Sequence, residues 1–393
     1  MELLLYLYIL IVVYLFLKYS RIRTLYIFSP YILIYLNFIF NDAIPFLFFY
    51  PDVPENIQYT TFTAAIINLS FLFLFRKQAQ VPISINLPLS SIKLNKKRKI
   101  LLSCFVFFLL WAGVMSGVLI NLLRGNNIED LRRTSEIGVG VIRDIPMLGI
   151  QIIMLVLFLQ KTWKCYYKVV AFYSFCLSVF LFLTTGNKGG VLVGVTLFLL
   201  FFHLKKRGFK WYEYVLYYLA MPLAAGTLQG IRGGDLTLIA SQIAVFFSYP
   251  VILYQANSIP IMNAVGTENF FWGEEYYTGL VKFIPRFLWP DKPLSFDYKL
   301  ANYDFEGGGI YTTLCNDLYI NFGYYYFIFY ILWLLFIHYL YGMVMDDKRF
   351  YYSRIIALFI ILMGGIASTI GSCEILLLFL LFLILYYSRV KTL

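Results

Sequence analysis

Long continuous runs of apolar residues are the feature that most constrains what this chain can fold into. Residues 3–17 and 375–387 contain no charged side chain. Inside a bilayer every backbone amide must be satisfied within the protein, so a spanning segment is a helix or a strand of a closed barrel. Barrel strands alternate polar and apolar residues, and these runs do not. The runs therefore predict membrane-spanning helices.

The composition agrees with lipid as the main solvent. Hydrophobic residues make up 61% of the chain and charged residues 13%, whereas a soluble domain carries about 25% charged residues. The net charge of +11 does not indicate a nucleic-acid partner, because the basic residues lie in short loops between the apolar runs. That placement is typical of membrane topology. The five cysteines show no metal spacing, so neither a metal nor a cofactor is expected.

A spanning helix needs about 20 mostly apolar residues, which predicts about eleven spans. The fold class is therefore an all-α polytopic integral membrane protein, with residues 1–393 forming a single membrane domain. Met1 and Glu2 supply no positive charge for a cleavable signal peptide, so the first run is expected to be a retained helix. The predicted spans are 2–17, 25–41, 58–75, 100–122, 146–160, 168–185, 189–204, 211–229, 316–340, 352–371 and 373–388.

The loops between the spans predict the orientation. Most of the 32 Lys and Arg residues fall in alternate loops, where the acids are only Glu213, Asp346 and Asp347. Positively charged loops stay in the cytoplasm. The N-terminus is therefore expected in the periplasm and the C-terminus in the cytoplasm of a bacterial inner membrane. The basic loops are 18–23, 76–99, 161–168, 205–210, 348–354 and 389–391.

Three polar stretches fall on the opposite, periplasmic side: 41–58, 124–144 and 229–316. The last is the longest and forms one large late loop. Residues 236–255 within it are apolar enough to touch the bilayer. A full span there would place the 346–349 loop, which carries two acids and two basic residues, outside the cytoplasm. We therefore predict a re-entrant or interfacial helix at 236–255.

Cations in these periplasmic stretches are candidates for binding an anion. Arginine suits bidentate phosphate contacts and lysine acts as a point charge. Glycines beside Lys188 and Arg232 permit close backbone approach to a ligand. Each cation also has a plain alternative, which is to extend toward lipid headgroups. The candidate phosphate-binding residues are Lys188, Arg232, Arg286, Lys292, Arg132 and Arg133.

A general base on this side is expected to be a carboxylate. The two histidines, His203 and His338, lie at or toward cytoplasmic ends of predicted spans and should not reach a periplasmic site. No serine-hydrolase, zinc-protease or phosphate-loop motif is present. The candidate catalytic residues are Asp317, Glu274, Glu275 and Asp235, and Asn321 and Trp289 are candidate glycan contacts.

Three elements in the order and spacing of residues 100–340 resemble the Wzy-type polymerases of O-antigen repeat units. The first is a Thr-Gly-Asn-Lys-Gly turn between two spans at 185–189. The second is Pro-Arg-Phe-Leu-Trp-Pro-Asp-Lys-Pro at 285–293 in the late loop. The third is Asn-Phe-Gly at 321–323, where the next span begins. In two respects the chain departs from the family: Lys188 replaces the usual arginine, and no Arg-x10-Gly repeat occurs in the outer loops.

The resemblance implies a fold similar to the GT-C class of lipid-dependent glycosyltransferases. It implies polymerisation of undecaprenyl-pyrophosphate-linked oligosaccharide repeat units, such as O-antigen, at the periplasmic face. A carboxylate would take the proton of an acceptor hydroxyl as it attacks the donor's anomeric carbon, and the cations would hold the leaving pyrophosphate. Aromatic residues of the late loop would stack on sugars or pack on the membrane. A chain-length regulator and a flippase are the implied partners.

Two other functions share parts of this pattern. An O-antigen ligase has the same architecture, but we would expect a histidine in its outer loop, and residues 229–316 contain none. A flippase or transporter for the lipid-linked unit would favour inverted repeats and short outer loops. The long late loop argues against it.

Overall fold

The computed structural model describes residues 2–20, 30–75, 250–252, 254–281, 288–293 and 312–345, with single helical positions at Ser103, Val169, Phe172, Tyr173 and Thr227. The chain divides into two compact units, Met1–Leu87 with Ser248–Leu393, and Pro88–Phe247. The helices below belong to the first unit. Every regular element of the described residues is helical, which confirms the all-α class for that part. The predicted spans at 100–122, 146–160, 168–185, 189–204, 211–229, 352–371 and 373–388 lie outside the described residues apart from those single positions.

The first helix, α1 (Glu2–Ser20), agrees with the predicted first span. Leu5, Tyr8 and Val12 recur at helical spacing and are fully buried, so one stripe of the helix faces the other helices. Lys18 lies in the last turn, where a cation complements the helix dipole, and its ammonium sits 5.6 Å from the centre of the Tyr14 ring.

The second helix runs further than predicted. It comprises α2 (Pro30–Phe38), a π-helical segment η2 (Ile39–Ala43) and α3 (Ile44–Phe49). The sequence predicted a span that ends at residue 41, whereas the helix continues to Phe49 and takes in the first residues of the predicted polar stretch 41–58. Pro45 lacks a backbone N–H, and a π segment is one way in which a helix accommodates a lost bond and continues.

Two helices of the described residues are long and apolar enough to cross a membrane. The first is α4 (Glu55–Leu74), close to the predicted 58–75. The second combines α17 (Leu314–Phe322), the 3-10 turn η5 (Gly323–Tyr325) and α18 (Tyr326–Met345), close to the predicted 316–340. Shorter apolar helices cover Glu2–Leu15 and Ile34–Phe49.

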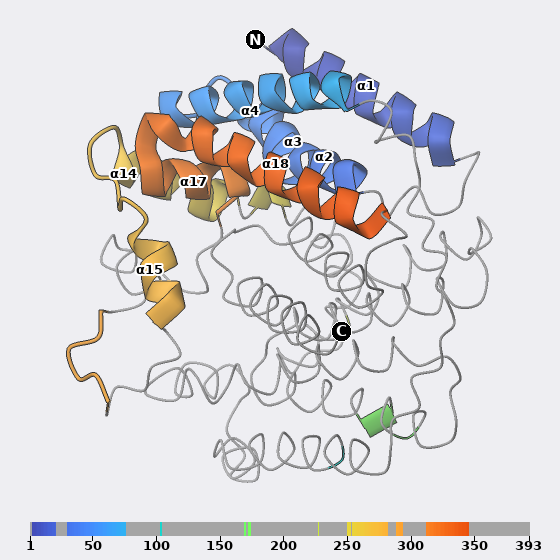
Figure 1. The fold of residues 1–393 in the computed structure, drawn as a ribbon. Coiled ribbons are helices and arrows are strands. Elements are labelled where there is room, and N and C mark those ends of the chain that lie inside the picture. Colours follow the sequence, from blue (N-terminus) through green and yellow to red (C-terminus); the bar gives the residue numbers. More distant parts are fainter. Residues whose placement is uncertain are drawn as a thin grey trace. The chain divides into compact units, whose positions relative to one another are not determined.

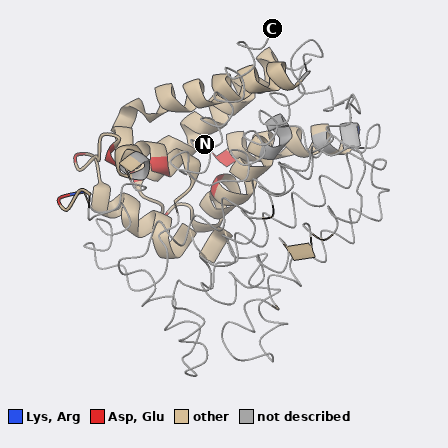
Figure 2. Cartoon of the chain, turned by 60° about the horizontal axis from the view of Figure 1, so that its bottom comes forward, with Lys and Arg blue, Asp and Glu red and all other residues tan. Residues whose placement is uncertain are grey.

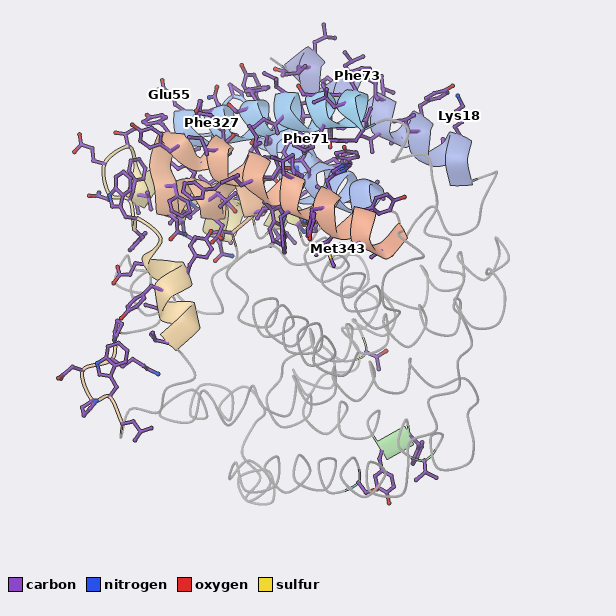
Figure 3. The ribbon with its side chains drawn as sticks, viewed as in Figure 1. Lys18, Glu55, Phe71, Phe73, Phe327 and Met343 are labelled. Carbon is purple, nitrogen blue, oxygen red and sulfur yellow. The ribbon has the colours of Figure 1, made fainter. Side chains whose placement is uncertain are left out.

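These helices pack side by side, with α4 in contact with α1 on one side and with α17 and α18 on the other (Figure 1). The helices α4 and α18 run in the same direction. The Tyr326 hydroxyl donates to the Thr60 carbonyl over 2.7 Å near the start of both, and the rings of Phe75 and His338 lie 3.9 Å apart near the other end. Figure 3 shows the same order, with the labelled residues Glu55 and Phe327 at one end and Phe73 and Met343 toward the other.

Shorter helices lie at the end where α4 and α17 begin. They are η4 (Tyr254–Ser258), α14 (Ile259–Val265) and α15 (Glu274–Val281). Of the re-entrant helix predicted at 236–255, only its last residues, 250–252 and 254–255, are described, and they are helical. The helix α14 contacts both α4 and α17, so the late part of the chain returns to the first polar stretch.

Candidate functional site

Polar side chains gather where α4 and α17 begin, and we call this region the polar end. The residues that form it come from the start of α4, the turn 266–273 and the first turns of α17. Many of them are buried although they are polar, which is costly unless they are hydrogen-bonded. The buried polar residues of these segments are Asn56, Thr60, Thr312, Thr313, Asn316, Asp317 and Asn321.

Asn56 joins α4 to α14. Its side-chain amide donates to the carbonyls of Met262, at 2.6 Å, and Gly266, at 3.3 Å. Its own side-chain oxygen accepts from the Ile57 N–H at 2.8 Å. One buried asparagine therefore ties the first turn of α4 to a segment 206 residues away in sequence.

The start of α17 is capped in the usual manner of helices. The Thr313 hydroxyl accepts from the Asn316 N–H at 3.3 Å, which satisfies one of the free donors of the first turn. The Asn316 side chain in turn accepts from the Thr60 hydroxyl at 3.0 Å. The Nδ2 atom of Asn316 is buried and has no hydrogen-bond partner among the described residues.

Asp317, a predicted catalytic carboxylate, is fully buried. One carboxylate oxygen accepts from the Tyr276 hydroxyl at 3.3 Å and the other from the Thr312 hydroxyl at 3.4 Å. The Tyr276 ring stacks on Phe322 with centroids 5.7 Å apart. These contacts fix the orientation of the carboxylate, and a substrate would reach it only after Tyr276 or Thr312 moves.

Asn321, a predicted glycan contact, lies one turn after Asp317 and is also buried. Its amide donates to the Asp317 backbone carbonyl at 3.0 Å. Asn321 therefore bonds to the backbone of its own helix, four residues earlier, and its side chain does not face an open surface.

Asp42 is a buried carboxyl that sequence reasoning missed. It lies in the π segment η2 and is 4% exposed. Its Oδ1 atom has no hydrogen-bond partner within the described ranges. The signal in the sequence was a single acid, next to Asn41, between two apolar segments. The predicted polar stretch 41–58 placed it in water.

The turn 266–273 contains three residues in the left-handed region, at φ +58° for Gly266, +49° for Trp272 and +82° for Gly273. The turn is anchored by the Phe271 N–H, which donates to the Ile320 carbonyl at 3.0 Å. Trp272 is the one non-glycine residue of the described chain with a positive φ.

The structure explains why residue 323, the last of the Asn-Phe-Gly element, is a glycine. Its φ is +57°, where α17 ends, and a Cβ atom there would lie 2.6 Å from the Phe270 ring. Only glycine fits both the backbone conformation and the space. The element therefore lets the turn 266–273 pack directly on the bend between α17 and α18.

The other predicted site residues lie in two places or fall outside the described chain. Glu274 and Glu275 are in the first turn of α15, and the side chain of Glu274 is half-buried. Trp289 and Lys292 share a turn in which the Lys292 N–H donates to the Trp289 carbonyl at 3.1 Å. The predicted residues outside the described chain are Asp235, Lys188, Arg232, Arg286, Arg132 and Arg133.

The described part of the polar end is acidic. Glu55, Glu268 and Glu274 belong to the segments that meet there, and Figure 2 shows acidic residues in red among the helices. The only described cations of the chain are Lys18 in α1 and Lys292. The predicted anion-binding set therefore depends on residues beyond the described ranges, with Lys292 as its one described member. Among the described residues no group of three His, Cys, Asp or Glu side chains is placed to hold a metal ion.

No family model, curated protein or solved structure matches this chain.

Proposed function

We propose that this chain is a glycosyltransferase of the bacterial inner membrane that polymerises undecaprenyl-pyrophosphate-linked oligosaccharide repeat units at the periplasmic face. The single observation that carries the proposal is the polar end. There residues 254–281 of the late loop and α17, which carries the Asn-Phe-Gly element that resembles the polymerases, meet the start of α4 in one buried hydrogen-bonded cluster.

The arrangement of α4 and α18 supports the proposed side of the membrane. Both helices were predicted to run from the periplasm to the cytoplasm, and they run in the same direction. A polar, buried cluster at the shared starting end of two candidate spans is expensive unless it is used. His338, near the opposite end, contacts Phe75 and so lies away from the polar end.

The proposed reaction transfers a growing glycan from its lipid carrier to the terminal sugar of a lipid-linked repeat unit. An acceptor hydroxyl oxygen bonds to the donor's anomeric carbon, and the bond from that carbon to the pyrophosphate oxygen breaks. The hydroxyl proton passes to a carboxylate, and undecaprenyl pyrophosphate leaves with the electron pair. Asp317 is the proposed acceptor of the proton, because hydroxyls from Tyr276 and Thr312 orient both its oxygens.

The leaving pyrophosphate needs positive charge, and the described part of the polar end is acidic. Lys188, Arg232, Arg286, Lys292, Arg132 and Arg133 are the proposed sources of that charge. Preorganised cations stabilise developing negative charge without reorganisation. A chain-length regulator and a flippase are the proposed partners in the membrane.

The experiment is a gel of surface polysaccharide from cells that lack this gene and carry wild type or a variant. Wild type should restore a ladder of repeat units. Arg232→Ala and Asp317→Asn, at equal membrane abundance, should leave a single repeat unit on the core. The matched control is Asp52→Asn, which changes an exposed acid in the turn between α3 and α4 and should leave the ladder intact.

The result that contradicts the proposal is loss of even the single-unit band on deletion. That outcome indicates ligation or transport of the unit, since polymerisation is not needed to attach one unit.

A further inference from the structure

An aromatic surface lies at the polar end, around Phe270. The ring of Phe270 meets Trp272 edge-on with centroids 6.0 Å apart, and Tyr324 edge-on at 6.4 Å. The Trp272 side chain is 66% exposed and that of Tyr324 is 47% exposed. We call Phe270, Trp272 and Tyr324 the aromatic platform.

The platform is rigidly supported from below. Phe270 also packs edge-on against the fully buried Tyr319 at 5.5 Å and fills the space above Gly323. Next to it, the Phe271 N–H is bonded to the Ile320 carbonyl at 3.0 Å. The rings that face outward are therefore fixed to α17 rather than carried on a free loop.

Trp272 is held in an unfavourable backbone conformation. Its φ of +49° lies in the left-handed region, which is unfavourable for a residue other than glycine. Fold stability alone does not account for a tryptophan here, because its indole is mostly exposed and a glycine would adopt the same φ without strain. Strain of this kind clusters at functional sites.

The charges near the platform indicate which ligand it fits. The residues within four positions of Trp272 include Glu268, which is exposed, and Glu274, which is half-buried. No Lys or Arg lies between residues 254 and 281. A tryptophan anchored at lipid headgroups is favoured by neighbouring cations, whereas carboxylates repel anionic headgroups. Carboxylates accept hydrogen bonds from hydroxyl groups, and aromatic rings pack against the C–H face of a sugar.

We propose that the aromatic platform binds one pyranose ring of a glycan, with the sugar's C–H face on the Trp272 indole and its hydroxyls directed to the flanking carboxylates. The inference deepens the proposed function and rests on it for the presence of a glycan at this end of the protein. The platform is a positioning subsite: it holds the glycan and takes no part in bond breaking.

The test uses the purified full-length chain in detergent micelles. The probe is the oligosaccharide mixture released by mild acid from the lipid-linked pool of cells that carry this gene. Binding is measured calorimetrically for wild type and for variants Trp272→Phe, Trp272→Gly and Tyr324→Ala. The matched control is Tyr339→Ala, which removes a tyrosine that is 57% exposed on α18 away from the platform.

Wild type, Trp272→Phe and Tyr339→Ala should bind the mixture comparably, since Phe keeps an aromatic ring. Trp272→Gly and Tyr324→Ala should bind at least about tenfold more weakly. The thermal midpoint of Trp272→Gly should equal or exceed that of wild type, because glycine relieves the strain at φ +49°. Weaker binding with unchanged or higher stability separates a binding role from a structural one.

A second measurement addresses the membrane. Vesicles of phosphatidylcholine and phosphatidylglycerol with brominated acyl chains quench tryptophans that contact lipid. The difference between wild type and Trp272→Phe isolates this one indole. Strong quenching of Trp272 together with equal glycan binding by Trp272→Gly overturns the proposal and assigns the platform to the membrane interface.

Failure of this inference is distinguishable from failure of the proposed function. Normal ladders in cells with Trp272→Gly, together with unchanged glycan binding, would disprove the platform as a glycan-binding subsite. The proposal that the chain is a polymerase would be unaffected. If glycan binding depends on Trp272 but deletion of the gene leaves the ladder unchanged, the platform is supported as a glycan-binding subsite. The same result would disprove the proposal that the chain is a polymerase.

Discussion

The Thr60 hydroxyl donates to the side-chain oxygen of Asn316 over 3.0 Å, although 256 residues separate them in the chain. Both side chains are fully buried. This bond joins the start of α4 to the start of α17, the two helices of the described chain that are long enough to cross a membrane. The first polar stretch and the end of the late loop are therefore parts of one structure.

The first prediction concerns that bond. Thr60→Val keeps the shape of the side chain and removes the hydroxyl, whose one proton is shared between the Asn316 side-chain oxygen and the Ile57 carbonyl, each at 3.0 Å. The Ile57 carbonyl is in the same helix, so the bond lost between helices is the one to Asn316. We expect a loss of about 1–2 kcal/mol in the free energy of unfolding. Ser70→Ala is the control, because the Ser70 hydroxyl is exposed and donates only to the Ile66 carbonyl of its own helix. Thermal unfolding in micelles measures both, and equal effects of the two variants would show that the bond contributes nothing.

The second prediction concerns Gly323. A Cβ atom at Gly323 would overlap the Phe270 ring and force a residue with a side chain into φ +57°. Gly323→Ala should therefore lower stability by about 2–3 kcal/mol and displace the aromatic platform. Gly342→Ala is matched to it, because Gly342 lies in the last turn of α18 and a Cβ atom there meets nothing within 4 Å. It should raise stability by about 0.5–1 kcal/mol. A Gly323→Ala protein as stable as wild type would contradict the observed packing.

The third prediction concerns the buried carboxyl of Asp42. Its side chain is 4% exposed, and its Oδ1 atom has no hydrogen-bond partner within the described ranges. A buried charge without a partner destabilises a fold.

Asp42→Asn removes the charge and keeps the shape of the side chain, so it should be more stable than wild type at pH 8. Thermal midpoints at pH 8 give the comparison, and exposed Asp52→Asn should unfold at the wild-type midpoint. An Asp42→Asn protein that is less stable than wild type would contradict the buried placement of Asp42.

The fourth prediction concerns the orientation of Asp317. Tyr276→Phe removes the hydroxyl that donates to its carboxylate at 3.3 Å and keeps the ring that stacks on Phe322. We expect polymerisation by purified protein to fall by about tenfold to a hundredfold, with little change in the apparent affinity for the lipid-linked unit. Exposed Tyr277→Phe, one residue further along α15, should behave as wild type. A change in affinity alone would place Tyr276 in substrate binding instead.

The apolar runs predicted the helices well where the described chain tests them. The predicted spans 58–75 and 316–340 agree with α4 and with α17 to α18 within a few residues, because hydrophobic length alone determines such helices. Asn-Phe-Gly at 321–323 was also singled out, and Gly323 proves to be fixed by local backbone geometry. Both signals are local, so a single sequence carries them.

The contacts that build the polar end were not predictable from the sequence. Asn56 bonds Met262, and Thr60 bonds Asn316, across more than 200 residues. Local patterns say nothing about such pairings. Asp42 was assigned to a water-facing stretch because an acid usually ends a span, whereas the π segment lets the helix continue and buries it. Asp317 was predicted as a candidate base, but its burial and its bonds to Tyr276 and Thr312 could not be read from the sequence.

The most direct measurement is chain growth in vesicles that contain only the purified protein and its lipid-linked repeat units. The predicted result is multiples of the unit that appear together with released undecaprenyl pyrophosphate. These products should disappear in Asp317→Asn and persist in Asp52→Asn. A repeat unit that stays single, or that only crosses the bilayer, would contradict glycosyl transfer at the polar end.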